Sequence, residues 1–334
     1  MIKRRPTLAD IATAAGVSLM TVSRAINGKP GVSRALRQKI LALAEELRYR
    51  PNQIARGLAT SLTAAVGLVV PDNTNPFFAQ IVRGVEDAAH ENGYNIFLIN
   101  TNEDPTRELD ALDALWEKDI DGVILCSSRL PAQVLETQIQ RFPAMVVVNR
   151  GTLAPQPNLT TVNVNDQRGA QLAIQRFVTM GRKQIAYIAG RSASTSNHRR
   201  LEGYRSSLRA ANLPWDAQLV EAAFPSTDGG REAATALLAR KLDLDAIFAF
   251  NDLVAVGAVQ VCQEAGKRVP ADIAVIGVDD IPLATIFRLQ LTTLHVDMLK
   301  IGNLSMLSLL DIITGDGSPD AIQVEPELWI RDSA

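Results

Sequence analysis

Polar side chains that could bind a small, hydroxyl-rich ligand recur directly after apolar, strand-like runs of this sequence. The polar residues are Asn149, Ser194, Ser196, Arg200, Asn251 and Asp279, and an aromatic pair, Phe77 and Phe78, follows another such run. A planar guanidinium and carboxylates beside an aromatic wall suit a polyol, whose vicinal hydroxyls accept hydrogen bonds from arginine and donate them to aspartate. Taken singly, each residue is more simply explained as a helix cap or a turn residue. Their recurrence at successive strand ends favours a binding site.

Spacings that would indicate catalysis or metal binding are missing from the sequence. The phosphate-loop, nucleophile-elbow and zinc-protease patterns do not occur, and Gly266-Lys267 is followed by arginine where a phosphate loop needs serine or threonine. None of the three histidines stands at metal-ligand spacing from another, and Cys126 and Cys262 each lie in an apolar run typical of reduced core thiols. We therefore expect neither an enzyme nor a metal or other cofactor.

Length and composition are those of an ordinary globular protein. The 334 residues are 47% hydrophobic and 21% charged, which excludes a disordered or collagen-like chain and allows two or three domains. No apolar run approaches the roughly 18 residues that a membrane span needs. The basic start Met-Ile-Lys-Arg-Arg-Pro is not followed by the apolar segment of a signal peptide. We expect a cytoplasmic protein.

Charge is distributed unevenly along the chain. The first 60 residues carry eleven lysines and arginines against three acidic residues, a net charge of +8, whereas the remainder carries −10. A solvated basic face would explain this charge alone, but a small basic module joined to an acidic body is also typical of a polyanion reader.

Helical periodicity in this basic segment predicts a helix-turn-helix. Thr7 can cap a helix over 8–15, Gly16 supplies the tight turn, and Ser18 can cap a second helix over 19–27. A supporting helix is expected over 33–47. The expected small core consists of Ala12, Gly16, Val17, Val22 and Ile26. The motif places its second helix in the major groove of DNA, so that the exposed side chains of that helix would meet the bases.

Several motifs of the first 58 residues occur together in a known family. They are Thr7-Leu8-Ala9-Asp10-Ile11-Ala12, Ala15-Gly16-Val17-Ser18, Thr21-Val22-Ser23-Arg24-Ala25-Ile26-Asn27 and Leu47-Arg48-Tyr49-Arg50-Pro51-Asn52. These runs resemble the DNA-binding signature of the lactose/galactose repressor (LacI/GalR) family, and the resemblance continues through nearly the whole chain. It implies a DNA-binding domain over 1–50, a hinge helix or linker over 51–62 and an effector-binding and dimerisation domain over 63–334. The DNA-contacting residues that it implies are Thr7, Ser18, Leu19, Met20, Thr21, Ser23, Arg24, Asn27, Ser33, Asn52, Ala55, Arg56 and Leu58.

The expected hinge helix, over 54–60, is only two turns long. A helix that short is marginal in isolation, so we expect it to form only when packed, for example against its copy in a dimer and against DNA. The resemblance implies that Leu58 wedges into the minor groove at the centre of a palindrome, where an inserted side chain partly unstacks a base step and kinks the duplex. An ordinary linker with one exposed leucine is the alternative.

From residue 63 onward, short strand-like runs alternate with amphipathic helical stretches. The runs are 66–70, 95–100, 122–126, 144–149, 161–164, 184–189, 246–250 and 274–278. Runs that are apolar on both faces between such helices indicate parallel sheets covered by helices, and two similar halves indicate paired α/β subdomains with a cleft at the carboxyl ends of their strands. The expected fold is therefore a three-helix helix-turn-helix domain and a hinge helix, followed by two α/β subdomains of the periplasmic-binding-protein type. The resemblance further implies that the chain crosses between these subdomains near 162, 292 and 323.

The resemblance also assigns effector contacts in the second domain. Arg200 matches an arginine that clamps effector hydroxyls or carboxylates, and Asn251 and Asp279 match effector-binding side chains. Ser194 and Ser196 stand where the purine-binding member of the family has arginine and threonine, which argues against a nucleobase and leaves a sugar, a sugar acid or a related polyol open. Further positions that match the aromatic side of the pocket or often touch ligand are Phe77, Phe78, Asn149 and Phe224.

Together these features predict a transcriptional regulator, most simply a repressor that binds a palindromic operator in duplex DNA and is released by a small sugar or sugar acid. The sequence has no long C-terminal heptad region, so we expect a homodimer. A catabolite-control regulator that takes a phosphocarrier protein as corepressor is one alternative. A stand-alone sugar-binding protein of the periplasmic type is another, and both the basic N-terminal module and the missing signal peptide disfavour it.

Overall fold

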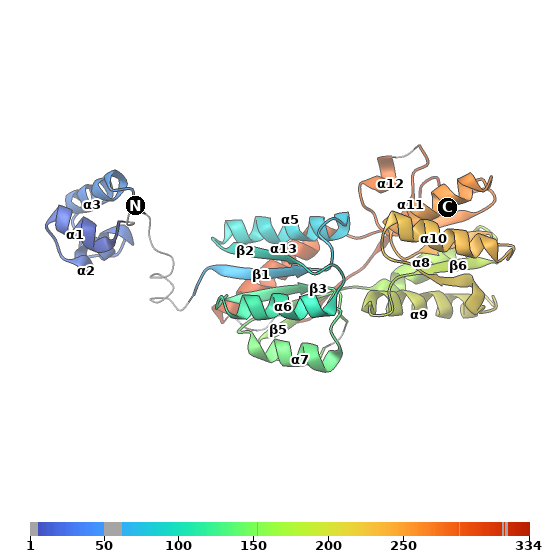
Figure 1. The fold of residues 1–334 in the computed structure, drawn as a ribbon, viewed down its shortest axis with the longest axis horizontal. Coiled ribbons are helices and arrows are strands. Elements are labelled where there is room, and N and C mark those ends of the chain that lie inside the picture. The colour runs from blue at the N-terminus through green and yellow to red at the C-terminus, as the bar shows by residue number, and fades with distance from the viewer. Residues whose placement is uncertain (1–5, 50–61, 152, 287, 316, 318–319) are drawn as a thin grey trace. The chain divides into compact units, whose positions relative to one another are not determined.

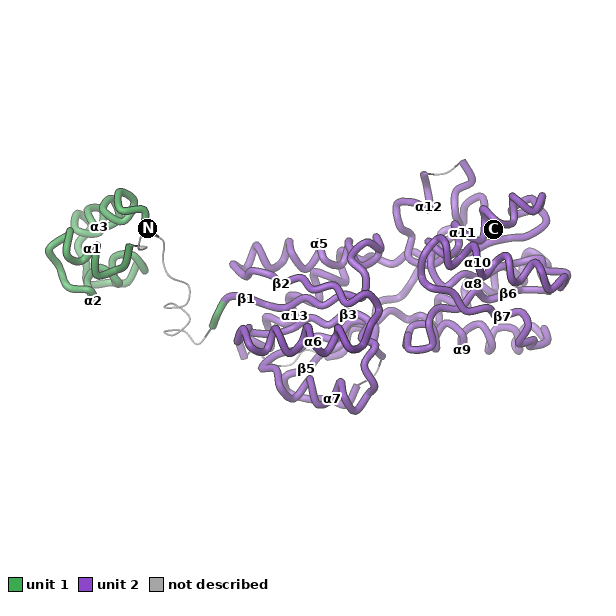
Figure 2. The backbone as a smooth tube through the Cα atoms, in the orientation of Figure 1, with its two compact units in different colours: residues 1–63 green, residues 64–334 purple. Residues whose placement is uncertain are grey.

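The computed structural model describes residues 6–49, 62–151, 153–286, 288–315, 317 and 320–334. The chain divides into two compact units, residues 1–63 and 64–334, which are coloured separately in Figure 2. Within the described residues, no helix is both long and apolar enough to cross a membrane. The predicted contacts Asn52, Ala55, Arg56 and Leu58 of the hinge segment lie outside the described residues.

The described residues of the first unit form three short helices, as the helix-turn-helix pattern predicts. They are α1 (Leu8–Ala15), α2 (Leu19–Ile26) and α3 (Arg34–Glu46). A capping box starts α1: the backbone N–H of Thr7 donates to the Asp10 carboxylate at 2.7 Å, and the Asp10 N–H donates back to the Thr7 hydroxyl at 3.4 Å. Gly16 ends α1 in the left-handed conformation, with φ of 68°, which only glycine adopts without strain.

The core of this unit differs in detail from the predicted one. Its buried residues are Ile11, Ala15, Val22, Ala25 and Ile40. Of the five predicted core residues, only Val22 is among them; three others, Ala12, Val17 and Ile26, are half-buried around it. The prediction was wrong for Gly16, which is exposed, because this residue is required for the turn and has no side chain to bury.

The second unit consists of two lobes, each a six-stranded sheet between helices (Figure 1). The sheet of the N-terminal lobe has the order β11-β5-β4-β3-β1-β2 and is parallel throughout. Its strands are β1 (Ala65–Val70), β2 (Asn95–Asn100), β3 (Gly122–Cys126), β4 (Met145–Val148), β5 (Leu159–Val164) and β11 (Ile322–Val324). One face is covered by α5 (Pro76–Glu91) and α13 (Met298–Thr314), the other by α6 (Pro105–Trp116) and α7 (Ala132–Arg141).

The C-terminal lobe repeats this plan with the order β12-β10-β9-β8-β6-β7. Its strands are β6 (Ile185–Ala189), β7 (Val220–Ala222), β8 (Ala246–Ala249), β9 (Ala274–Asp279), β10 (Thr292–His295) and β12 (Glu327–Trp329), of which β12 alone among the described strands runs antiparallel to its neighbour. Helices α8 (Asp166–Thr179) and α9 (Thr195–Ala210) cover one face, and α10 (Thr227–Ala239) and α11 (Asp252–Glu264) cover the other. A 3₁₀ turn, η1 (Ala217–Leu219), precedes β7, and the short α12 (Leu283–Ile286) lies between β9 and β10. The predicted fold class, with two parallel-sheet α/β subdomains, is confirmed.

Three segments carry the chain between the lobes: β5 leads into α8, β10 into α13 and β11 into β12. Hydrogen bonds tie the first crossing to the third, because the Asn165 backbone N–H donates to Val324 O at 2.9 Å and the Asn165 side chain donates to the Glu325 carboxylate. Next to the second crossing, the His295 ring stacks on Trp329 with centroids 3.8 Å apart and planes 4° apart.

Glycine allows a close contact between α5 and α13 in the N-terminal lobe. A Cβ built on Gly84 of α5 would lie 2.1 Å from the backbone oxygen of Leu299 in α13, and one on Gly302 of α13 would lie 2.1 Å from Ile81 O. The two helix backbones therefore approach one another more closely than any side chain at these positions permits. This contact joins α13, which follows the second crossing, firmly to the lobe that begins with β1.

Candidate functional site

Loops at the carboxyl ends of strands from both sheets of the second unit enclose a cavity. The described residues that line it are Asn75, Phe77, Phe78, Glu103, Ser127, Arg129 and Asn149 from the N-terminal lobe and Ser194, Ser196, Arg200, Pro225, Phe250, Asn251 and Asp279 from the C-terminal lobe. This is the edge at which parallel α/β sheets bind ligands.

Arg200 is the central cation of the C-terminal wall. It lies on the second turn of α9, where its buried guanidinium donates from Nε to Asp166 Oδ1 at 2.9 Å and from Nη1 to the backbone oxygen of Phe250. Its Nη2 lies 2.8 Å from Asp166 Oδ1 and 3.9 Å from Asp279 Oδ1. The guanidinium also lies 4.8 Å from the centroid of the Phe250 ring, a cation–π contact. Arg200 is thus held rigidly between two carboxylates and an aromatic face.

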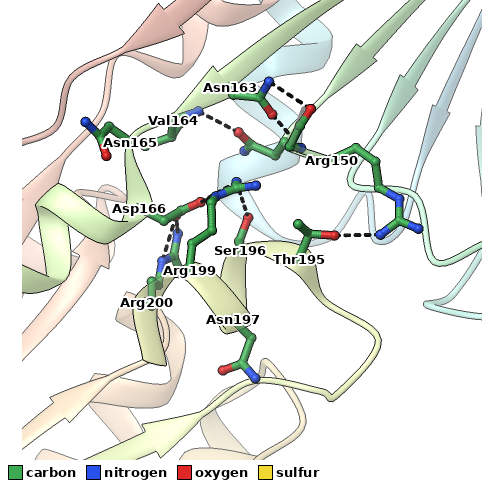
Figure 3. Close-up of polar contacts among 12 residues, drawn as sticks. Arg150, Asn163, Val164, Asn165, Asp166, Thr195, Ser196, Asn197, Arg199 and Arg200 are labelled. Carbon is green, nitrogen blue, oxygen red and sulfur yellow. Dashed lines mark hydrogen bonds and ion pairs between the residues drawn. The ribbon is translucent and has the colours of Figure 1, made fainter. Parts of the chain in front are cut away.

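Asp166 is shared between two neighbouring arginines, as Figure 3 shows. Arg199 donates from Nε to Asp166 Oδ2 at 3.0 Å, while Arg200 contacts Oδ1. The Asp166 side chain is only 1% exposed and lies at the start of α8, directly after the first crossing. These contacts fasten α9, which carries Arg200, to the crossing segment.

Asp279, unlike Asp166, lines the cavity on its C-terminal wall. Burial raises the pKa of Asp279 to about 7, against an ordinary 3.8; the nearby Arg200 guanidinium opposes this rise and the Asp166 carboxylate adds to it. The loop that follows Asp279 is anchored by Asp252, which accepts hydrogen bonds from the Ile281 N–H at 2.9 Å and from the Thr293 hydroxyl. Burial among these carboxylates also raises the pKa of Asp252 well above its ordinary value.

The N-terminal wall combines an aromatic pair with a buried ion pair. The Phe77 and Phe78 rings pack edge to face with centroids 5.1 Å apart. Glu103 receives two hydrogen bonds from Arg129, from Nε at 2.6 Å and from Nη2 at 2.9 Å, and Arg129 Nη1 donates to Ser127 O at 2.7 Å. The side chains of Arg129 and Glu103 are 7% and 3% exposed. This wall offers charged, hydrogen-bonding groups beside an apolar surface.

Four lining residues other than glycine have left-handed backbone conformations. They are Glu103, Ser127, Asn149 and Asp279, with φ of 59°, 47°, 55° and 107°. Such conformations cost on the order of 1–3 kcal/mol each and gather where a protein must aim side chains at a ligand. Each of them lies at or within three residues of the end of a strand.

A direct hydrogen bond between Arg150 and Thr195 joins the two lobes near the cavity. Arg150, just after β4, donates from Nη1 to the Thr195 hydroxyl at the start of α9, at 2.6 Å (Figure 3), and from Nη2 to Leu130 O at 2.5 Å. Asn149, beside it, accepts a hydrogen bond from the Val164 N–H at 2.9 Å. The end of β4 is therefore fixed both to the first crossing and to the opposite lobe.

The structure brings eight of the nine predicted effector contacts to this cavity. These eight are Phe77, Phe78, Asn149, Ser194, Ser196, Arg200, Asn251 and Asp279. Phe224 is not among the lining residues: its side chain is 49% exposed, with the Arg191 guanidinium 5.8 Å from its ring, and the next residue, Pro225, lines the cavity instead.

Six lining residues are not among the nine predicted effector contacts: Asn75, Glu103, Ser127, Arg129, Pro225 and Phe250. Glu103 and Arg129 follow the runs 95–100 and 122–126, so the strand-end rule would have found both had it been applied to every run. Within the described residues, no group of three or more His, Cys, Asp or Glu side chains could hold a metal ion.

The described DNA-contact candidates lie on α2 and at the three helix starts of the first unit. Thr7, Ser18 and Ser33 are N-caps, each accepting a hydrogen bond from a backbone N–H of its helix. On α2, Leu19 and Met20 are 53% and 65% exposed.

The remaining candidates on or beside α2 are Thr21, Ser23, Arg24 and Asn27. The Thr21 and Ser18 hydroxyls are hydrogen-bonded at 2.9 Å, and the Asn27 amide donates to Ser23 O at 3.0 Å. Arg24 is exposed. The solvent face of α2 thus begins with two apolar side chains and carries one cation a turn later.

Comparison with known proteins places both units in one family. Residues 7–52 match bacterial regulatory proteins of the lacI family, and residues 63–331 match the periplasmic binding proteins and sugar binding domain of the LacI family. The chain is 36% identical to the ribose operon repressor of Escherichia coli K12 over 331 residues, 98% of this chain and 99% of that protein. It is 35% identical to catabolite control protein A of Priestia megaterium over 302 residues, 90% of each. The lac repressor dimer bound to operator and the anti-inducer ONPF superposes with a TM-score of 0.89 at 26% identity, covering 99% of each chain. The family resemblance of the sequence is thereby confirmed, and the chain belongs to the LacI family of DNA-binding transcriptional regulators.

Proposed function

We propose that this regulator binds a palindromic operator as a homodimer and releases it when a small sugar-like effector fills the cavity of the second unit. The observation that carries the proposal is the composition of the cavity wall. Arg200 and Asp279 come from one lobe, and Phe77 and Phe78 from the other, so one ligand can touch both lobes at once. We assign no catalytic role to any residue of the cavity. Because the proposed target is operator DNA, the proposed location of the protein is the cytoplasm.

The effector acts through the angle between the lobes. A ligand that contacts both walls stabilises one relative orientation, and contacts such as Arg150 with Thr195 would form or break with that orientation. The N-terminal lobe begins at β1, directly after the expected hinge segment, so its movement would change the separation of the two hinge segments in a dimer. Ordering of the hinge on DNA would change with it.

On the DNA side, α2 is proposed to occupy the major groove. The exposed Leu19 and Met20 cannot make the bidentate hydrogen bonds by which arginine reads guanine, and they would pack on thymine methyl groups instead. Arg24 is the proposed guanine reader. For Leu58, the proposed minor-groove wedge, support comes from the family resemblance alone.

A second candidate is regulation by a protein corepressor. The 35% identity to catabolite control protein A favours this candidate. In this case a phosphocarrier protein would bind the regulator and tighten its binding to the operator, whereas the proposed sugar would release the operator. The two candidates predict opposite signs for the change in operator affinity when the effector binds.

A thermal-shift screen of sugars, sugar acids and polyols tests the proposed effector site. A ligand present at 100 times its Kd stabilises the folded state by about 2.7 kcal/mol, which a melting curve resolves. We expect at least one sugar to raise the Tm of the wild-type protein and to leave the Tm of an Arg200→Ala variant unchanged. If none of the sugars shifts the wild-type Tm, the proposed effector class is wrong.

A further inference from the structure

The buried pair of Glu103 and Arg129 is a feature of the cavity wall to which neither the resemblance nor the proposed mechanism gives a role. The two residues come from different loops, after β2 and after β3, and their side chains are 3% and 7% exposed. Two hydrogen bonds join them, at 2.6 and 2.9 Å, and both residues line the cavity. The pair therefore places one full positive and one full negative charge beside the ligand.

Charge is balanced on both walls of the cavity. Arg129 is neutralised by Glu103, and Arg200 is held by Asp166 at 2.8 Å and lies 3.9 Å from Asp279. Among the described lining residues, every arginine thus already has a carboxylate partner. An anionic ligand either displaces Glu103 from Arg129, which leaves that carboxylate buried without a partner, or places its own negative charge beside the carboxylates that already hold the two guanidinium groups. Both outcomes are unfavourable in a buried site.

Uncharged hydroxyl groups meet no such obstacle. Glu103 and Ser127 O use three of the five N–H donors of Arg129, so that two donors remain. Each Glu103 oxygen accepts one hydrogen bond from Arg129 and keeps a second lone pair for a hydroxyl donor. The intact pair can therefore both donate to and accept from vicinal hydroxyls.

We propose that the Glu103–Arg129 pair makes this cavity selective for an uncharged polyhydroxy ligand, such as a neutral monosaccharide, and excludes sugar acids and sugar phosphates of the same size. This inference rests on the proposed function in one respect, that the cavity is the effector site. Of the three ligand classes that the sequence leaves open, it excludes the sugar acids and keeps the neutral sugars and the related polyols.

Isothermal titration of the full-length protein at pH 8, where the Asp279 carboxyl is mainly ionised, tests the selectivity. The probes are matched sets: ribose, ribonate and ribose 5-phosphate, and glucose, gluconate and glucose 6-phosphate. We expect a neutral sugar of one set to bind about 100-fold more tightly than its acid and its phosphate, since a charged hydrogen bond that must be broken without replacement changes affinity by about 10- to 100-fold.

The Glu103→Gln variant supplies the complementary measurement. It keeps the shape of the side chain but leaves the Arg129 guanidinium without its carboxylate, so affinity for the sugar acid should rise at least about tenfold. Glu136→Gln, an exposed change on α7 in the same lobe, is the matched control and should leave all affinities unchanged. The double variant Glu103→Gln/Arg129→Gln, which restores charge balance, should lose the gained acid binding. If the single variant does not fold, the wild-type titrations of the matched sets still test the selectivity.

The outcomes separate this inference from the proposed function. If wild-type protein binds an acid or a phosphate as tightly as the neutral sugar, the selectivity is refuted while the effector site stands. If folded Glu103→Gln protein binds acids no better than wild type, the assigned role of the pair is wrong. If the wild-type protein binds none of the six probes, the neutral sugar that raises the Tm in the thermal-shift screen is titrated with its own acid and phosphate instead, and equal affinities refute the selectivity. The proposed sugar effector is refuted only if that screen finds no sugar.

Discussion

Replacing Arg200 by alanine removes the cation that lies between two buried carboxylates of the C-terminal lobe. The Asp166 and Asp279 side chains are 1% and 7% exposed, and that of Arg200 is 6% exposed, so water cannot replace the lost guanidinium. The backbone oxygen of Phe250 also loses its Arg200 donor. The variant should therefore be destabilised as well as unresponsive to effector.

The size of the loss follows from these contacts. Breaking a buried ion pair by removing one partner costs about 3–5 kcal/mol. Arg199 still pairs with Asp166, so we expect a value near the lower end, about 3 kcal/mol. For a unit of this size that corresponds to a fall in Tm of roughly 6–12 °C. The pKa of Asp279 should rise further above 7, because the Arg200 charge that lowers it is gone.

Tryptophan fluorescence is a suitable assay, because Trp116, Trp215 and Trp329 all lie in residues 64–334 and report only on that unit. Thermal unfolding of wild-type and Arg200→Ala protein would be compared at pH 8. Arg209→Ala, an exposed change on the same helix, is the control and should alter stability by less than about 0.5 kcal/mol. A decrease in Tm smaller than 2 °C, or an Arg200→Ala protein that still responds fully to the effector, would refute the role assigned to Arg200.

Three further changes probe other parts of the molecule. Because the folded state holds the Asp279 proton with a pKa of about 7, against 3.8 ordinarily, the cost of this carboxyl to stability grows as pH rises from about 4 to about 7. The free energy of unfolding of Asp279→Asn minus that of wild type should therefore be about 3 kcal/mol larger at pH 8 than at pH 5, as measured by urea unfolding at both pH values. The same difference at both pH values would contradict the raised pKa. Met20→Gln should change the half-site preferred in a binding-site selection more than it changes non-specific affinity, and an unchanged consensus would count against groove contact by Met20. Gly84→Val should cost about 3 kcal/mol of unfolding free energy, because its Cβ meets Leu299 O in α13, and a near-neutral result would show that the helix contact is looser than described.

Much of the fold could be predicted from periodicity, and the strands that were not predicted are short. The eight predicted strand runs correspond to strands whose ends differ by two residues or fewer. Strands β7, β10, β11 and β12 were not predicted, since three or four residues show no clear periodicity. The partner of β11, strand β5, also lies far away in the sequence. The antiparallel β12 forms only because the chain returns from the other lobe at the third crossing.

The candidate site could be predicted where strand ends and family motifs agreed. Arg200 and Asp279 satisfy both criteria and line the cavity. Glu103 and Arg129 match no motif, and their pairing depends on two loops that only the sheet order brings together. Phe224 does not line the cavity: its backbone lies against Gly229 at the start of α10, and its side chain is exposed.

Operator affinity measured with and without saturating effector tests most directly whether the two units are coupled. The duplex would be obtained by selection from random sequence, and the effector from the thermal-shift screen. We predict that a bound neutral sugar weakens operator binding at least tenfold, about 1.4 kcal/mol, and that bound operator weakens sugar binding by the same factor. An operator Kd that is identical with and without the sugar, while calorimetry shows the cavity to be filled, would contradict effector-controlled release.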